Sequence, residues 1–193
     1  MFKWKLTKNL TNPLDPEWDE LADSALGTAV HPDRKMGFLL SREALKMALK
    51  SLGYDTPIRD LKLSHFHQLL LCPKLTISLS HTKECGVALI ADRKDFHSLG
   101  IDVEHEERQV KDNILDRITH PDDDASLRKI EIWCLKEACF KALMNTGKFA
   151  APVEFNSIQM ASDRWIHSPS KLEGEWRIER IRPFVVAMAF LKN

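Results

Sequence analysis

The spacing of hydrophobic and polar residues predicts both helices and strands. Helices are expected at 16–26, where Asp15 can cap the first turn and Pro16 suits its first position, at 32–52, before Gly53, and at 125–144. Alternating or continuous apolar runs predict strands at 75–80, 86–91, 99–104, 155–160, 176–181 and 184–190. Because run 184–190 is apolar throughout, we expect it at a central position in a sheet. A short helix within 110–118 and loops over 54–73 complete an α+β pattern.

The strand expected at 99–104 carries two carboxylates on one face. Its apolar residues Leu99, Ile101 and Val103 alternate with Gly100, Asp102 and Glu104. Residues two apart on a strand lie about 6.5–7 Å apart at Cα. Asp102 and Glu104 can therefore converge on one hard cation, for which carboxylates are preferred ligands. The alternative is that both side chains only solvate a strand edge.

The helix expected at 125–144 places charges within its apolar face. That face is formed by Ile130, Trp133, Cys134, Phe140 and Met144. Glu137 and Lys141, one turn apart, fall in its middle. Burying a charge among apolar side chains is costly unless the charge is paired or binds a metal. Glu137 can thus be a third carboxylate for the same cation, or it can form an ordinary exposed pair with Lys141.

Basic residues and histidines suggest further candidates. Lys35, Arg42 and Lys46 follow one stripe of the helix at 32–52, which fits either an anion site or a solvated helix face. His81 ends the strand at 75–80, as an anion-binding donor or a surface residue. The two histidines of the His65-Phe66-His67 segment have no nearby cysteine or acid to complete a metal site, so we interpret them as structural.

Charge and cysteine content narrow the function classes. The 193 residues contain 28 basic and 28 acidic side chains, and a net charge of zero argues against general binding of nucleic acid. The sequence has no apolar run long enough to span a membrane, and its first residues lack the apolar core of a signal peptide. Four cysteines without a C-x-x-C pair predict reduced, structural thiols in a cytoplasmic protein.

Two segments together carry a family resemblance. Gly100-Ile-Asp-Val-Glu104, followed about thirty residues later by Trp133-Cys-Leu-Lys-Glu-Ala-Cys-Phe-Lys141, resembles the paired signature of the 4'-phosphopantetheinyl transferases. In that family the signature reads roughly G-[IV]-D-x-E, then W-[STC]-x-K-E-[SA]-x-x-K. Three weaker similarities accompany it, at 34–42, at 77–82 and at 146–148. The Gly-Lys-Pro tripeptide of many relatives is missing, which leaves the mode of coenzyme binding open.

The resemblance implies roles for individual residues. It implies that Asp102, Glu104 and Glu137 hold Mg²⁺, and that Glu137 and Lys141 are catalytic. It also implies contacts with coenzyme A from a set of basic and polar side chains, namely Arg34, Lys35, Arg42, Ser80, His81, Lys136 and Lys148. Among Arg34, Lys35 and Arg42 on the early helix, Arg42 is the strongest candidate.

The resemblance further implies the reaction and the domain organisation. The protein would transfer 4'-phosphopantetheine from coenzyme A to a serine of an apo acyl or peptidyl carrier protein. We expect the longer, single-chain type of the family, a monomer with two similar lobes at 1–95 and 96–193, each with helices packed on a small antiparallel sheet. Two alternatives stay open: a catalytically impaired homologue that binds coenzyme A, and another Mg²⁺-dependent phosphotransfer or phosphohydrolase enzyme.

Overall fold

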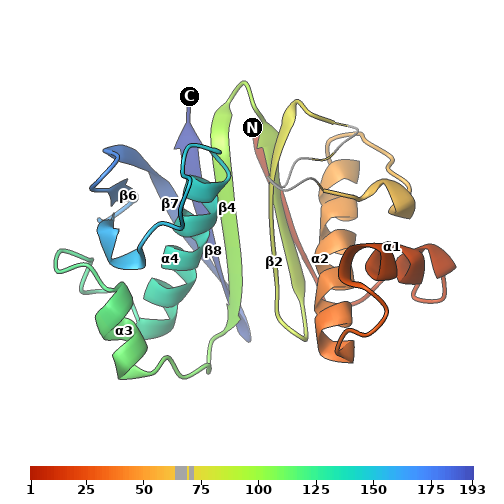
Figure 1. The fold of residues 1–193 in the computed structure, drawn as a ribbon, viewed down its shortest axis with the longest axis horizontal. Helices are drawn as coiled ribbons and strands as arrows, with labels where there is room; N and C mark the ends of the chain where they lie inside the picture. The colour runs from red at the N-terminus through yellow and green to blue at the C-terminus, as the bar shows by residue number, and fades with distance from the viewer. Residues whose placement is uncertain (64–68, 70–71) are drawn as a thin grey trace.

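The computed structural model describes residues 1–63, 69 and 72–193 of the chain. His65 and His67 lie outside the described residues, so the structural role predicted for them stays a prediction. The described part is an α+β fold with four α-helices and two antiparallel sheets, and Figure 1 shows the sheets side by side with helices on their outer sides. No helix within the described ranges combines the length and apolar character needed to cross a membrane.

The first half of the chain builds the smaller sheet and its helices. Strands β1 (Phe2–Thr7), β3 (Gly86–Asp92) and β2 (Leu75–His81) pair antiparallel in the order β1-β3-β2. Helices α1 (Pro16–Leu26) and α2 (Pro32–Lys50), together with the 3-10 turn η1 (Ile58–Asp60), lie on its outer face. The Asp15 carboxylate caps α1 by accepting a hydrogen bond from the Glu17 backbone N–H, as predicted.

The second half builds a five-stranded sheet in the order β4-β8-β7-β6-β5. Its strands are β4 (Phe96–His105), β8 (Phe184–Lys192), β7 (Leu172–Ile181), β6 (Arg164–His167) and β5 (Ile158–Met160). Helix α4 (Lys129–Met144) packs against the outer face of this sheet, and the short helix α3 (Asp112–Ile118) lies beside α4. The 3-10 turn η2 (Phe155–Ser157) precedes β5.

The inner faces of the two sheets form a third apolar core between the helical layers. It joins residues of β3, β4 and β8 with half-buried residues of β1: Val87, Leu89, Leu99, Ile101, Val103, Val186, Met188, Phe2 and Trp4. Along β4 the apolar residues point into this core, so the alternate residues point toward α4. The edges of β2 and β4 also meet, because the Ile101 backbone N–H donates to Ser78 Oγ at 3.0 Å.

Several element predictions are confirmed and others need correction. The helices at 16–26 and 32–52 are present, the second ending at Lys50, and β8 has a neighbour on each side as expected. Helix α4 begins at Lys129 rather than at 125, because the Glu131 carboxylate accepts a hydrogen bond from the Arg128 backbone N–H and closes a capping box there. Strand 155–160 was too long, since a 3-10 turn occupies its first half. Strands β1 and β6 were not predicted.

Candidate functional site

Gly100 of β4 allows helix α4 to approach the sheet closely. A Cβ atom on Gly100 would lie 1.8 Å from the backbone carbonyl oxygen of Ala138 and 2.8 Å from the Ala142 backbone nitrogen. Contacts this short do not occur, so the close packing of α4 on β4 requires glycine at this position. As a result, the alternate side chains of β4 lie directly against the charged residues of α4.

Asp102 is the buried acceptor at the centre of this contact. It is 5% exposed, and its Oδ1 atom accepts hydrogen bonds from Lys141 Nζ and from Ser80 Oγ, each at 2.7 Å. Lys141 Nζ also donates to the Ile101 carbonyl oxygen at 3.1 Å. The other carboxylate oxygen, Asp102 Oδ2, is buried without a hydrogen-bond partner in the described part of the chain. Three elements, β2, β4 and α4, therefore meet at one carboxylate.

Glu104, two residues further along β4, is buried as well and is held by two donors. Trp133 Nε1 of α4 donates to Glu104 Oε1 at 2.8 Å, and Arg108 Nη1 forms an ion pair with the same oxygen. The Arg108 guanidinium carbon also lies 5.2 Å from the centroid of the Trp133 ring. Because Glu104 is 9% exposed and Asp102 less so, the alternative that both only solvate a strand edge is wrong.

Glu137 lies in the electrostatic field of both acids. Burial raises the pKa of Glu137, the carboxylates of Asp102 and Glu104 raise it further, and Lys141 and Arg108 act in the opposite direction. Lys141 is mostly buried and donates to Asp102, so the alternative of an exposed pair between Glu137 and Lys141 is also wrong. The two motifs thus place three carboxylates and one lysine in a single charged cluster.

The donor chemistry of this cluster fits a hard divalent cation. Such a cation prefers carboxylate oxygens, and the unpartnered, buried Asp102 Oδ2 is an atom that it would satisfy. As the side chains stand in residues 1–63, 69 and 72–193, no three His, Cys, Asp or Glu groups are arranged to hold a metal ion. In the structure, Asp102 forms an ion pair with Lys141, and Glu104 forms one with Arg108.

A basic region lies next to the acids, between α2 and the end of β2. The His81 ring lies against Gly37 of α2, where a Cβ atom would be 2.3 Å from His81 Nδ1. Burial lowers the pKa of His81, and the neighbouring charges of Lys141 and Arg42 lower it further. His81 is therefore neutral at pH 7, and its ring can donate one hydrogen bond to an anion without the attraction of a positive charge.

Arg42 completes this basic region. Burial lowers the pKa of the guanidinium to about 10, so Arg42 is still charged at pH 7. Its guanidinium carbon lies 4.3 Å from the centroid of the Phe38 ring, and Nη1 donates to Ser41 Oγ at 3.2 Å. The buried Nε atom has no hydrogen-bond acceptor among the residues described. A partly buried cation with an unused donor suits an anionic ligand.

Two of the other predicted site residues are held away from this region by ion pairs. Lys35 lies 2.8 Å from Asp19 and 3.1 Å from Asp23, and so ties α2 to α1. Lys136 is fully buried and pairs with Asp123 Oδ2 at 2.7 Å. The structure therefore does not bring Lys136 to Asp102, Glu104 and Glu137. The hydrophobic pattern left Lys136 outside the buried face of α4, whereas in the structure the buried face includes it.

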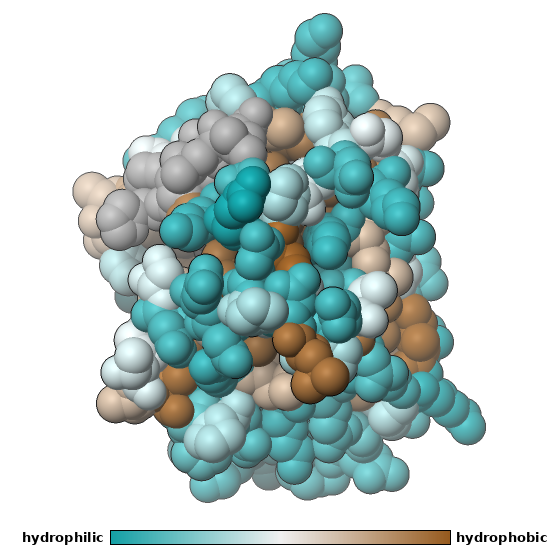
Figure 2. Space-filling model, turned by 90° about the vertical axis from the view of Figure 1, so that its right-hand side faces the viewer, coloured by the Kyte–Doolittle hydropathy of each residue, from teal (hydrophilic) through white to brown (hydrophobic). Residues whose placement is uncertain are grey.

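The remaining two predicted coenzyme-binding residues, Arg34 and Lys148, are exposed. Arg34 lies in the first turn of α2, and Lys148 follows the C-terminal end of α4. Burial lowers the pKa of His97, and the nearby positive charge of Lys148 lowers it further. Figure 2 shows the face of the molecule on the α1 and α2 side, which is mainly hydrophilic with small, separate apolar areas. The described residues on this face form no extended apolar area.

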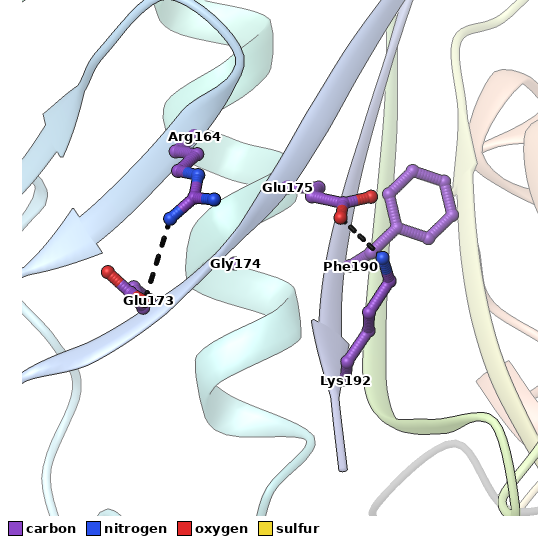
Figure 3. A pocket seen from close by; sticks show the side chains of 6 residues that line it. All are labelled: Arg164, Glu173, Gly174, Glu175, Phe190 and Lys192. Carbon is purple, nitrogen blue, oxygen red and sulfur yellow. Dashed lines mark hydrogen bonds and ion pairs between the residues drawn. The ribbon is translucent and has the colours of Figure 1, made fainter.

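One hollow in the protein surface lies beside Trp133, and another lies on the five-stranded sheet. A groove of about 620 Å³ is lined by Trp133, whose indole N–H donates to Glu104, together with residues of α3 and of the segment around η2. A smaller hollow of about 170 Å³ lies on β6, β7 and β8, around Gly174. Figure 3 shows that its charged side chains already pair with each other, Arg164 with Glu173 and Lys192 with Glu175. We therefore place the candidate site at the acids and not at this hollow.

Sequence reasoning missed two residues that hold Glu104. Trp133 was assigned only to the apolar face, although its indole N–H donates to Glu104. Arg108 was assigned to a charged surface segment, and its contact with Glu104 depends on the turn after β4, which no local pattern predicts. The four cysteines are free thiols, as predicted.

Comparison with known proteins gives a family similarity for the second half of the chain. Residues 98–188 match the family described as the 4'-phosphopantetheinyl transferase superfamily, a class of transferases. The matched residues are just under half of the chain and include most of β4, the whole of α4 and the acids Asp102, Glu104 and Glu137. A search of curated proteins returned no match.

Proposed function

We propose that this protein transfers 4'-phosphopantetheine from coenzyme A to a serine hydroxyl of an apo acyl or peptidyl carrier protein, with Mg²⁺ as cofactor. The observation that carries the proposal is the buried contact between Asp102 and Lys141, beside Glu104 and Glu137. This contact unites the two sequence motifs in one cluster within the region that matches the superfamily.

Asp102, Glu104 and Glu137 are the residues proposed to hold the cation. Their oxygen donors suit Mg²⁺, which is commonly bound through a few carboxylates together with substrate phosphates. When bound, such a cation polarises the phosphoryl group and stabilises charge on the leaving oxygen. Lys141 lies next to the same site and would stabilise negative charge on the pyrophosphate, because its ammonium already contacts the Asp102 carboxylate.

The basic region formed by Arg42 and His81 is proposed to bind a phosphate of the coenzyme. Arg42 supplies a charged guanidinium with an unused donor, and the neutral His81 ring supplies one N–H. Ser80 already bonds to Asp102 Oδ1, so we assign it to the orientation of that carboxylate rather than to a direct phosphate contact.

The reaction forms one P–O bond and breaks another. The serine oxygen of the carrier attacks the phosphorus that bears pantetheine, and the bond from this phosphorus to the bridging oxygen breaks. Adenosine 3',5'-bisphosphate leaves with that oxygen. Glu137 is the proposed acceptor of the serine proton, because burial and its acidic neighbours raise its pKa and make it a stronger base than an ordinary glutamate.

The division of the chain into two lobes is part of this proposal. Each half contributes its own sheet with a long helix on the outer face, α2 on one and α4 on the other. The boundary expected after residue 95 falls between β3 and β4. We propose that these halves are the two lobes of the longer, single-chain type of transferase, acting as a monomer in the cytoplasm.

Incubation with coenzyme A, Mg²⁺ and an apo carrier separates this function from its alternatives. The proposal predicts release of adenosine 3',5'-bisphosphate only when the carrier is present, and loss of release in Asp102→Asn. Release without a carrier would indicate a phosphohydrolase. Binding of coenzyme A in calorimetry without release, across several carriers, would indicate an impaired homologue, which the missing Gly-Lys-Pro favours.

A further inference from the structure

Arg108 occupies the carboxylate that the proposed metal site would use. Its guanidinium forms an ion pair with Glu104 Oε1, the same oxygen that accepts from Trp133 Nε1. The Glu104 side chain is 11% exposed, whereas that of Arg108 is 48% exposed. The carboxylate is thus fixed inside the protein, and its cationic partner reaches it from the surface.

The position of Arg108 allows it to leave Glu104 without leaving the site. Its guanidinium already lies over the Trp133 ring, at 5.2 Å from the centroid, and such a contact stabilises a cation independently of Glu104. Arg108 also lines a pocket of about 310 Å³ with Lys83 and His105, so there is space beside its present position. A modest rotation about the side chain would expose Glu104 to another cation.

We propose that Arg108 is a tethered counter-cation that neutralises Glu104 before metal loading and competes with the divalent cation for this carboxylate. The inference rests on the metal site of the proposed function. Arg108 is a positioning residue, because it acts through Glu104.

Replacing Arg108 should strengthen metal binding, because it removes both a repulsive positive charge and the group that competes for Glu104. A unit positive charge within several ångströms of a divalent cation opposes its binding even when water screens most of the interaction. Removing Arg108 should therefore tighten metal binding roughly three- to tenfold at low ionic strength. Because Arg108 is half-exposed, the difference should shrink as added salt shortens the screening length.

Calorimetric titration of the purified protein with MnCl₂ or MgCl₂, without coenzyme or carrier, tests this inference. Arg108→Gln should bind the metal more tightly than the wild type. Arg59→Gln is the matched control, because Arg59 forms an exposed pair with Glu17 at 3.5 Å and its loss changes the net charge equally. The control should bind the metal as the wild type does, and Glu104→Gln should weaken binding in every background.

A second readout follows the site itself. The indole N–H resonance of Trp133, identified by its disappearance in Trp133→Phe, should shift on addition of Mg²⁺, and at lower Mg²⁺ concentration in Arg108→Gln. Equal or weaker metal binding in Arg108→Gln would overturn the role of Arg108 while leaving the metal site intact. Absence of metal binding in all variants would overturn the inference, and the assay with coenzyme A and carrier then decides separately whether the metal-dependent function stands.

Discussion

Replacing Gly100 with alanine tests whether the close approach of α4 to β4 builds the acidic cluster. The new methyl group would have to occupy a position 1.8 Å from the Ala138 carbonyl oxygen. That atom belongs to the helix backbone and cannot rotate away as a flexible side chain would. The helix and the strand must therefore separate until the contact exceeds about 3 Å, since shorter Cβ contacts essentially do not occur.

The size of the effect follows from this displacement. Overpacking in a well-packed core typically costs about 1–3 kcal/mol, and a clash with two backbone groups of the same helix belongs at the upper end of that range. The Lys141–Asp102 contact, now 2.7 Å, connects the same helix to the same strand. A shift of the helix by an ångström or more would lengthen this ion pair beyond hydrogen-bonding distance and leave the Asp102 carboxylate buried without its cation.

Urea denaturation and calorimetric metal titration together provide the assay. Gly100→Ala should lower the free energy of unfolding by about 3 kcal/mol and weaken metal binding under conditions where the protein is still folded. Gly174→Ala is the matched control, because its Cβ would lie 2.1 Å from the Phe190 carbonyl oxygen on β8, away from the acids. It should destabilise the protein but leave metal binding unchanged. Stability and metal binding of Gly100→Ala equal to those of the wild type would show that the acidic cluster does not depend on the close approach of α4 to β4.

Three further predictions concern buried charges and the coenzyme. Lys136→Met should lower the free energy of unfolding, measured by urea denaturation, by about 3–5 kcal/mol, because it leaves Asp123 buried and unpaired. A loss below about 1 kcal/mol would contradict this expectation. Burial acts to raise the pKa of Glu131, but hydrogen bonds from Arg128 and a second arginine lower it overall. The ionised Glu131 therefore stabilises the folded protein above the usual pKa of 4.5, and this stabilisation disappears as the pH falls through the lowered value. Glu131→Gln should therefore cost about 1–3 kcal/mol at pH 7 and progressively less in acid, and a constant difference would contradict this. Arg42→Ala should weaken coenzyme A binding at least about tenfold in calorimetry, because it removes a charge-assisted hydrogen bond, whereas equal weakening by Lys35→Ala would contradict the assignment.

The fold was predictable where one face of an element meets a core and the other meets solvent. Helix α1 has such a pattern and was predicted at its observed bounds. Strand β2 alternates apolar with hydroxyl residues and was predicted within one residue, although all of its residues except His81 are buried. The N-terminal strand β1 also alternates, through Phe2, Trp4 and Leu6, but the segment was considered only as a possible signal peptide. Strand β6 has four residues, too few for a periodic signal. Sheet order and the packing of the two sheets depend on distant pairings that no single segment encodes.

The candidate site was predictable where one element carries the information. The alternation around Asp102 correctly placed the carboxylates on the face opposite the apolar residues. The apolar face of α4 was misplaced, because Trp133 and Phe140 pack against Phe155 at the side of the helix rather than under the sheet. For that reason the burial of Lys136 was not foreseen. Contacts across elements, such as Arg108 with Glu104, required the fold.

Intact-mass spectrometry of an apo carrier protein after incubation with this protein, coenzyme A and Mg²⁺ tests the central claim most directly. The proposed function predicts that the carrier gains the mass of one phosphopantetheine group. The gain should be lost with a chelator, with a carrier whose acceptor serine is replaced by alanine, and in Asp102→Asn. A mass gain that persists in Asp102→Asn, or no gain with several fatty-acid and peptide-synthase carriers, would contradict the claim that this acidic cluster is a phosphopantetheinyl transfer site.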